Sequence, residues 1–267
     1  KKGWDYWELG FDKAVGTMGR NLIPQVKVLP RADHLDKFDP DKWTLICVEQ
    51  GIGDQILFLS VMEDAIEEWN NLFFVCEARL KPIIKRSFPK LQVGLPGLLE
   101  SWSKNSLAKN GFIPLGSLPG RYRPTVESFT NYKKPFLQVN GDLYVQYQKQ
   151  LRDIAKGRPI VGISWKGGYW ESQKKAKALG IENWLPIFER GALCVNLQYG
   201  DTSADENLIK EKGYELVSFP SIDFKVKLDD WLAIAAACDG IISVSTALVH
   251  FAGACGQKVG IVMPEPQ

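Results

Sequence analysis

The sequence is poor in the residues that build metal sites and disulfide frameworks. Its 267 residues include two histidines, His34 and His250, and five cysteines, no two of which are spaced as Cys-x-x-Cys. So few histidines exclude a His-rich metal site. An odd number of scattered cysteines, most of them in apolar segments, is typical of reduced thiols in a hydrophobic core. We therefore expect no bound metal ion and no disulfide.

An excess of charge of either sign is also absent. The chain carries 33 Lys and Arg against 31 Asp and Glu, a net charge of +2. This balance provides no overall field that would attract nucleic acid or an anionic membrane. It does not exclude a local basic pocket or a peripheral membrane contact, so we expect no nucleic-acid partner and leave membrane contact open.

No segment reads as a membrane anchor or a signal peptide. The polar and aromatic start, Lys1 to Glu8, contains no apolar core of a signal sequence. Residues 240–257 lack Asp, Glu, Lys and Arg but contain Ser243, His250 and three glycines, which favours a buried strand, turn and helix over a transmembrane segment. We expect a cytoplasmic protein.

Apolar runs of strand length alternate with segments of helical periodicity, which predicts parallel α/β units. The chain length suits two lobes, and 45% of the residues are hydrophobic, as in folded globular proteins. The predicted strands are 43–48, 72–76, 160–165, 193–198, 215–219, 240–244 and 259–263. The predicted helices are 55–69, 80–87, 144–156, 184–190, 205–212, 229–238 and 247–255. Gly and Pro interrupt 95–139, where we expect loops, and the break at 157–159 divides lobes 1–156 and 157–267.

A glycine-rich turn follows the first predicted strand. Gly51 and Gly53 would let the backbone turn sharply beside a ligand. A dinucleotide fingerprint needs a third glycine where this chain has Ile56, so a dehydrogenase is disfavoured. Asp54 is then a carboxylate at the carboxyl end of a parallel strand, where open α/β sheets bind ligands. The alternative is that Asp54 only caps the next helix.

A second polar cluster follows the strand 240–244. Ser245 and Thr246 lead into the first turn of the helix 247–255, where unpaired N–H groups and the helix dipole favour an anion such as a diphosphate. His250 lies one turn further on the same face. The alternative is an ordinary Ser/Thr cap with a histidine in the core. After the strand 160–165, Lys166 and Lys177 belong to a polar loop that could neutralise a diphosphate or could simply be solvated.

Two segments resemble the signature regions of the heptosyltransferase-like family 9 glycosyltransferases. They are EQGIGDQILF, Glu49 to Phe58, and ISVSTALVHFAGACGQKVGIVMP, Ile241 to Pro264, with VGISWKGG and CVNLQYGD in the expected order between them. The likeness is greatest to bacterial proteins in which such a module follows tetratricopeptide (TPR) repeats. It covers most of the chain and is thin between 95 and 139.

This resemblance implies a GT-B fold, in which two Rossmann-like lobes face a cleft. The lobe 1–156 would then be on the acceptor side and the lobe 157–267 would bind the nucleotide sugar, with no obligatory metal and no cofactor besides that donor substrate. By position, Asp54 would be the general base. Lys177, Ser245, Thr246, Ala247 and His250 would bind the donor diphosphate, Gln198 would approach its nucleoside, and Gly51, Gly53 and Lys166 would support the loops.

The predicted function is transfer of a sugar from a nucleotide diphosphate donor to a hydroxyl of a saccharide or protein acceptor. The family usually has Asp before the threonine of the second motif, where this chain has Ser245. That departure leaves two alternatives open: a non-catalytic GT-B module that binds a glycan or a protein, and a sugar-nucleotide epimerase.

Overall fold

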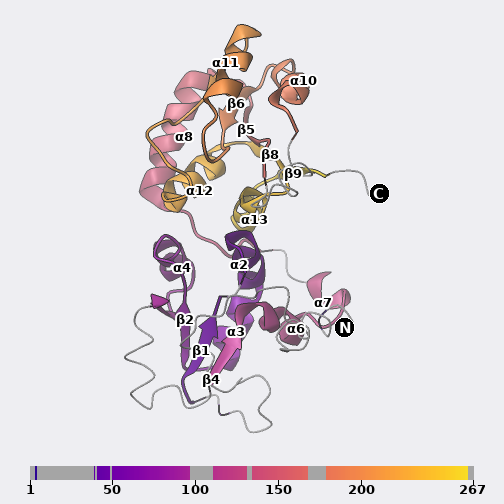
Figure 1. Cartoon of the computed structure of the whole chain (residues 1–267). Coiled ribbons are helices and arrows are strands. Elements are labelled where there is room, and N and C mark those ends of the chain that lie inside the picture. The colour runs from indigo at the N-terminus through magenta and orange to yellow at the C-terminus, as the bar shows by residue number, and fades with distance from the viewer. Residues whose placement is uncertain are drawn as a thin grey trace. The chain divides into compact units, whose positions relative to one another are not determined.

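The computed structural model describes residues 4, 39, 41–48, 50–96, 111–130, 134–167 and 179–263. The chain divides into two compact units, Lys1–Phe136 and Leu137–Gln267. Each unit contains one parallel sheet, with strand order β3-β2-β1-β4 in the first unit and β7-β6-β5-β8-β9 in the second. Both units are therefore α/β units, as the alternation of apolar runs predicted (Figure 1).

The sheet of the first unit has three fully buried strands, β1, β2 and β4. Its strands are β1 (Thr44–Cys47), β2 (Leu72–Val75), β3 (Gln92–Gly94) and β4 (Gly111–Pro114). Its helical segments are α2 (Ile52–Phe58), η3 (Leu59–Val61), α3 (Met62–Glu68), α4 (Lys81–Ser87), η5 (Leu115–Ser117), α6 (Leu118–Tyr122) and α7 (Glu127–Thr130). Every residue of β1 and β2 is buried, which explains why both strands read as continuous apolar runs.

The predicted helix 55–69 differs from the structure at its start and in its middle. Helix α2 begins at Ile52, because the Gln55 N–H reaches the carbonyl oxygen of Gly51 at 3.0 Å and closes the first turn there. A short 3₁₀ segment, η3, then separates α2 from α3. Strand β4 was missed altogether, because its sequence GFIP lies in the segment where Gly and Pro predicted loops.

The second unit has the longer sheet. Its strands are β5 (Ile160–Ser164), β6 (Leu193–Asn196), β7 (Leu216–Val217), β8 (Gly240–Val244) and β9 (Val259–Val262). Its helical segments are α8 (Gly141–Ala155), η6 (Ile181–Trp184), α10 (Leu185–Phe188), α11 (Ser203–Glu211), α12 (Leu228–Ala237) and α13 (Ala247–Ala254). The predicted bounds of β8 are confirmed, and the other predicted elements of this unit shift by one to three residues, with η6 and α10 in place of one helix at 184–190.

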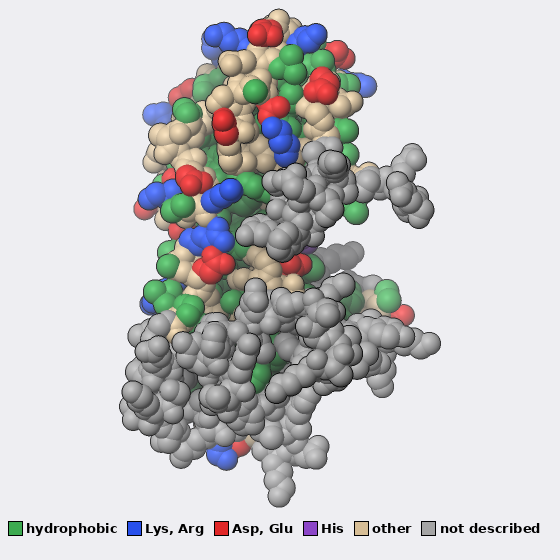
Figure 2. Space-filling model, viewed as in Figure 1, with side chains coloured by type: hydrophobic (Ala, Val, Ile, Leu, Met, Phe, Trp, Pro, Cys, Tyr) green, Lys and Arg blue, Asp and Glu red, His purple; other side chains and the backbone are tan. Residues whose placement is uncertain are grey.

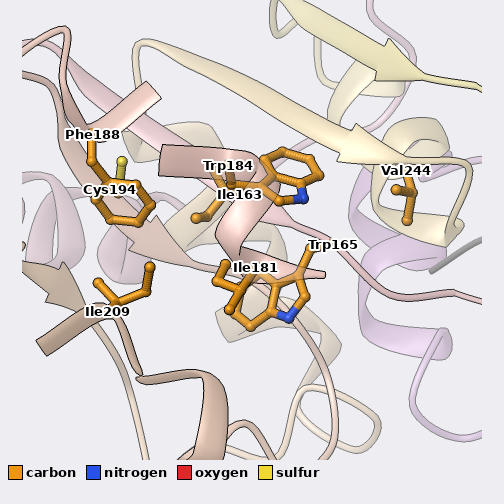
Figure 3. Close-up of a cluster of buried hydrophobic side chains, with 8 residues drawn as sticks. All are labelled: Ile163, Trp165, Ile181, Trp184, Phe188, Cys194, Ile209 and Val244. Atoms are coloured by element: carbon orange, nitrogen blue, oxygen red, sulfur yellow. The ribbon is translucent and has the colours of Figure 1, made fainter. Parts of the chain in front are cut away.

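The two faces of this sheet are packed differently. Figure 3 shows the cluster on one face, where Ile163, Trp165 and Cys194 pack with side chains from the helical segments η6, α10 and α11. On the other face Gly162 alternates with these residues, and a Cβ atom there would overlap the side chains of Leu197 and Ile241. The glycine therefore permits close packing in the centre of the sheet.

Helix α8 belongs to the second unit, whereas the predicted boundary at 157 had placed it in the first. It packs against α12, and Tyr147 donates a hydrogen bond to Asp230 at 2.6 Å. At its other end Arg152 forms an ion pair with Asp239, just before β8. The glycine and proline at 157–159 mark the end of a helix and not the division between the units.

None of the five cysteines forms a disulfide. Four of them are buried and Cys255 is half-buried. Burial raises the pKa of the Cys76 and Cys194 thiols to about 12. No helix in the described ranges is long and apolar enough to cross a membrane. Figure 2 shows Lys and Arg side chains interspersed with Asp and Glu over the visible, described surface of the second unit.

Candidate functional site

The carboxyl ends of β5, β6 and β8 lie at one edge of the second sheet, because these strands are parallel neighbours. The chain segments that leave this edge carry Lys166, Gln198, Ser245, Thr246, Ala247 and His250, which are six of the seven residues predicted in this unit. The structure therefore brings these residues to one region. Lys177 lies outside the described residues.

The start of α13 offers backbone N–H groups without a side-chain cap. Thr246 is the N-cap residue and is 9% exposed, yet its hydroxyl makes no capping hydrogen bond. Instead, Thr246 Oγ1 lies 3.2 Å from the hydroxyl of Ser243, the last but one residue of β8. The first turn of α13 contains no acidic residue. This geometry leaves the positive end of the helix dipole suited to an anion.

The remaining residues of this motif are partly accessible. Ser245 precedes the N-cap and is half-buried, as are Ala247 in the first turn and His250 one turn later. The small side chain of Ala247 leaves room beside the helix start, and the position of His250 on the helix agrees with the predicted spacing.

Gln198 is held in a network of hydrogen bonds between β5 and β6. Its carboxamide oxygen Oε1 accepts hydrogen bonds from Ser164 Oγ at 3.0 Å and from the backbone N–H groups of Trp165 and Lys166 at 3.0 and 2.8 Å. Its Nε2 donates to the carbonyl oxygen of Tyr199 at 3.1 Å. Both ends of the carboxamide are therefore occupied by protein groups. A direct contact of Gln198 with a nucleoside stays a prediction.

Lys166 is held at its backbone and at its side chain. Its N–H donates to Gln198, and its ammonium nitrogen lies 2.5 Å from Asp205 Oδ2 in the first turn of α11. The lysine therefore joins the end of β5 to α11. The charge of Lys166 is paired within the protein, and its role in supporting the loop stays a prediction.

A cavity lies beside this edge, and Gln198 is the one lining residue that sequence reasoning had selected. The cavity has a volume of about 360 Å³ and is lined by residues that follow β6 and β7. Asn196 donates to Thr202 Oγ1 at 3.0 Å and to Glu206 Oε1 at 2.8 Å, and Thr202 donates to the same carboxylate oxygen at 2.6 Å. In the sequence, the signal for these contacts is a polar residue at the end of a strand, Asn196, followed by Thr202 and by Glu206 on the next helix.

The wall of the cavity also contains aromatic and apolar groups. The Lys225 ammonium lies 5.5 Å from the centroid of the Tyr199 ring, and burial raises the pKa of the Tyr199 hydroxyl. Phe219, Ile222 and Phe224 supply apolar surface. A cavity with a few fixed polar groups and apolar walls is typical of a small-molecule site.

In the first unit, Asp54 lies in the first turn of α2, beyond the carboxyl end of β1. It is exposed, and the N-cap residue of α2 is Gly51, whose backbone closes the first turn. A Cβ atom at Gly51 would lie 3.4 Å from an Asp54 carboxylate oxygen, which is an ordinary van der Waals contact. Asp54 is therefore not the N-cap residue of α2, which was the alternative interpretation of this aspartate. Gly53 lies within α2 and not in a loop.

Among the described residues, no three His, Cys, Asp or Glu side chains are grouped so that they could hold a metal ion. Asp39 and Asp41, two carboxylates separated by one residue, are part of a turn before β1. Asp39 pairs with Lys42 at 3.1 Å, and Asp41 Oδ1 accepts a hydrogen bond from Asn70 at 2.7 Å.

No family model matches the sequence. The chain is 29% identical over 276 residues to protein FlbA of Caulobacter vibrioides (strain ATCC 19089 / CIP 103742 / CB 15), an alignment that covers 97% of this chain and 44% of that protein. The chain therefore spans less than half the length of this curated relative.

Two solved structures are similar to this chain in fold. The glycosyl transferase family 9 structure from Veillonella parvula DSM 2008 matches with a TM-score of 0.59 and 12% identity, over 86% of this chain and 83% of that chain. The E. coli ADP-heptose lps heptosyltransferase II matches with a TM-score of 0.56 and 15% identity, over 84% of this chain and 86% of that chain.

These likenesses show that the chain has a GT-B fold. The predicted resemblance to the heptosyltransferase-like family 9 glycosyltransferases is confirmed at the level of the fold. The association with TPR repeats stays a prediction.

Proposed function

We propose that this chain is a glycosyltransferase module that moves a sugar from a nucleotide diphosphate donor to an acceptor hydroxyl. The observation that carries the proposal is the edge of the second sheet, where an uncapped helix start and a polar-apolar cavity lie beyond neighbouring strands. The GT-B fold supports it, because solved glycosyltransferases have this fold.

The donor's diphosphate would bind at the start of α13. The N–H groups of the first turn would donate to its oxygens, and the helix dipole would favour its negative charge. His250 follows on the same helix and would add a hydrogen bond to a phosphate oxygen. Lys177 remains a proposed second cation. The sequence motif and the absence of an acidic residue in the first turn of α13 both support this placement.

The nucleoside would occupy the cavity beyond β6 and β7. Strands lie about 4.8 Å apart, so β6 and β8 are separated by about 10 Å across β5. A nucleoside in the cavity could therefore extend its phosphates past the end of β5 towards α13. The Glu206 carboxylate, oriented by Asn196 and Thr202, gives the cavity an acceptor for sugar or base donors.

Asp54 would act as the general base. The acceptor oxygen would attack the anomeric carbon of the donor sugar while its proton passes to the Asp54 carboxylate. The bond between that carbon and the phosphate oxygen would break, and the diphosphate would leave with the bonding electrons, stabilised at the start of α13. The exposure of Asp54 at the carboxyl end of β1 supports this role, since an acceptor can reach it. No step requires a metal ion.

The partners follow from the same proposal. The substrates would be a nucleotide sugar and a saccharide or protein acceptor, with the reaction in the cytoplasm and with peripheral membrane contact if the acceptor is lipid-linked. The whole polypeptide to which such a module belongs would determine the acceptor.

A second candidate is a non-catalytic GT-B module that binds a glycan or a protein. Ser245 favours it, because an acidic residue usually found in the family is replaced there. The two candidates differ in turnover: a catalytic module consumes a nucleotide sugar when its acceptor is supplied, whereas a binding module does not.

A thermal-shift panel of nucleoside diphosphates and their sugars tests the proposal. A ligand at about a hundred times its dissociation constant adds about 2.7 kcal/mol of stability to the folded state. We expect at least one nucleoside diphosphate to raise the melting temperature in a saturable manner. If none of the nucleoside diphosphates does so, the proposed function is wrong.

A further inference from the structure

The orientation of the Gln198 carboxamide is fixed by its partners. Backbone N–H groups can only donate, so the atom that faces those of Trp165 and Lys166 must be the oxygen. The Nε2 then faces the carbonyl oxygen of Tyr199, which can only accept. With 5% of its surface exposed, Gln198 is a buried polar group whose hydrogen bonds are all made within the protein.

These hydrogen bonds extend the contact between β5 and β6 beyond the sheet. The ladder between the two strands pairs Ile163 with Asn196. Past that point, one side-chain oxygen takes up the N–H groups of the two residues that follow β5. The chain leaving β5 is therefore held to the chain leaving β6 by a side chain instead of by the ladder.

The held segment lies between the two halves of the proposed donor site. On the β8 side, Ser164 is the register partner of Ser243, whose hydroxyl contacts the N-cap Thr246 of α13. On the β6 side, the Gln198 N–H donates to Asn196 Oδ1 at 2.9 Å, and Asn196 in turn orients Glu206 in the cavity. Gln198 thus connects polar groups on both sides of the end of β5.

We propose that Gln198 is a positioning residue, which sets the distance between the diphosphate subsite at α13 and the nucleoside cavity by holding the end of β5. This inference rests on the proposed function and assigns Gln198 an indirect role: it orients the backbone beside the donor. A ligand that occupies both subsites depends on the distance between them, whereas a ligand that occupies the cavity alone does not.

The experiment compares nucleosides with nucleoside diphosphates. Adenosine, guanosine and uridine and their diphosphates are titrated against the wild type, Gln198→Met, Gln198→Glu and the surface control Gln146→Met on α8. Gln198→Met removes the acceptor while nearly preserving the volume. Gln198→Glu keeps an acceptor oxygen for the two N–H groups but loses the hydrogen bond to the Tyr199 carbonyl oxygen, and it serves as the second variant if Gln198→Met does not fold.

For Gln198→Met we expect the dissociation constant of the diphosphate to rise by about tenfold, the scale found when a residue that orients a binding group is lost. Gln198 is itself part of the cavity lining, so the dissociation constant of the nucleoside should also rise, but by clearly less than that of the diphosphate. Gln198→Glu should bind both ligands more nearly like the wild type, and Gln146→Met should not differ from it. Hydrogen exchange at the N–H groups of Trp165 and Lys166 should be faster in Gln198→Met alone.

Several results would overturn this inference. Equal weakening of nucleoside and diphosphate binding would mean that Gln198 only maintains the fold or contacts the nucleoside directly. Unchanged diphosphate binding in Gln198→Met, or failure of Gln198→Glu to bind better than Gln198→Met, would also contradict the positioning role. Absence of diphosphate binding by the wild type is a different outcome, which would contradict the proposed function itself.

Discussion

The two sheets use buried polar side chains in different places. In the described part of the second unit, the buried polar residues all follow or end β5, β6 or β8 at the carboxyl edge: Ser164, Asn196, Gln198, Thr202, Ser243 and Thr246. In the described part of the first unit they are Thr44, Gln55, Ser87 and Arg123, and only Gln55 follows the carboxyl end of a strand. The first unit instead presents an exposed carboxylate, Asp54, at that edge.

This difference is informative because a buried polar group is costly unless it is hydrogen-bonded. A row of such groups at one edge indicates a preorganised site, whereas one exposed carboxylate needs no such support. The comparison supports the proposal that the second unit binds the donor and that the first unit supplies the base. Each of the following predictions tests one side of that assignment.

The largest effect is expected at Asp54. Replacing it with Asn removes the proposed base while keeping the size of the side chain, so sugar transfer should fall by about 10²–10⁴-fold. Binding of a nucleoside diphosphate should be unchanged, because the proposed donor site belongs to the second unit. Transfer assays and calorimetry on Asp54→Asn and on the control Glu67→Gln, an exposed carboxylate of the same unit, check both parts. Normal transfer by Asp54→Asn would remove the aspartate from the mechanism.

The next effect is expected at the start of α13. Ala247→Asp places a negative charge in the first turn, which should weaken diphosphate binding by about tenfold or more through repulsion. The same charge interacts favourably with the helix dipole, by about 0.3–1 kcal/mol in folding stability. Binding and stability should therefore change in opposite directions, as measured by calorimetry and denaturant unfolding. Gln146→Glu adds the same charge on α8 and should leave diphosphate binding as it is. Equal binding by Ala247→Asp would place the anion elsewhere.

A smaller effect, on the free energy of unfolding, is expected when one buried polar side chain is replaced in each unit. Asn196→Leu leaves the partners of its carboxamide, including the Gln198 N–H, without their hydrogen bonds and should cost about 1–3 kcal/mol in unfolding free energy. Ser87 of the first unit bonds to the carbonyl of Ile83 one turn earlier in its own helix. Its replacement by Ala should change stability by no more than about 0.5 kcal/mol. Urea unfolding of both variants measures the contrast, and equal losses would show that the polar edge of the second unit is not special.

The sequence predicted the sheets better than the site, and particular residues show why. Strand β8 was predicted with its observed bounds because GIISV is an apolar run between clear turn signals. The start of α2 was placed too late because Gly51 and Gly53 read as a turn, although Gly53 lies within the helix. Helix boundaries depend on such single hydrogen bonds, which composition does not report.

Gln198 was selected through the resemblance to the family 9 glycosyltransferases, but its partners could not be inferred. Ser164, Trp165 and Lys166 lie more than thirty residues away in the sequence, and only the parallel pairing of β5 with β6 brings them to its side chain. Most of the cavity lining was missed for the same reason, because it comes from Asn196, from the chain after β6, from α11 and from the chain after β7. Periodicity describes local structure and contains no information on such distant contacts.

The last prediction concerns the ion pair that joins α8 to the start of β8. The Arg152 guanidinium, followed by the Ile160 N–H, holds the pKa of the Asp239 carboxyl below its usual range. A depressed folded-state pKa means that the stabilisation is fully present above the ordinary Asp pKa and is lost as the pH falls through the folded-state pKa. Asp239→Asn should therefore cost about 1 kcal/mol at neutral pH and nothing once the carboxyl of the wild type is protonated. Denaturant unfolding of both proteins as a function of pH measures this, and a cost that persists in acid would contradict the ionic origin.

The most direct test of donor binding by the second unit is an NMR titration of the isotope-labelled chain with nucleoside diphosphates. We predict saturable shifts of the backbone N–H signals of Ala247 and Leu248, together with residues of the cavity such as Tyr199 and Lys225. Saturable binding that leaves the signals at the start of α13 unmoved would contradict the account.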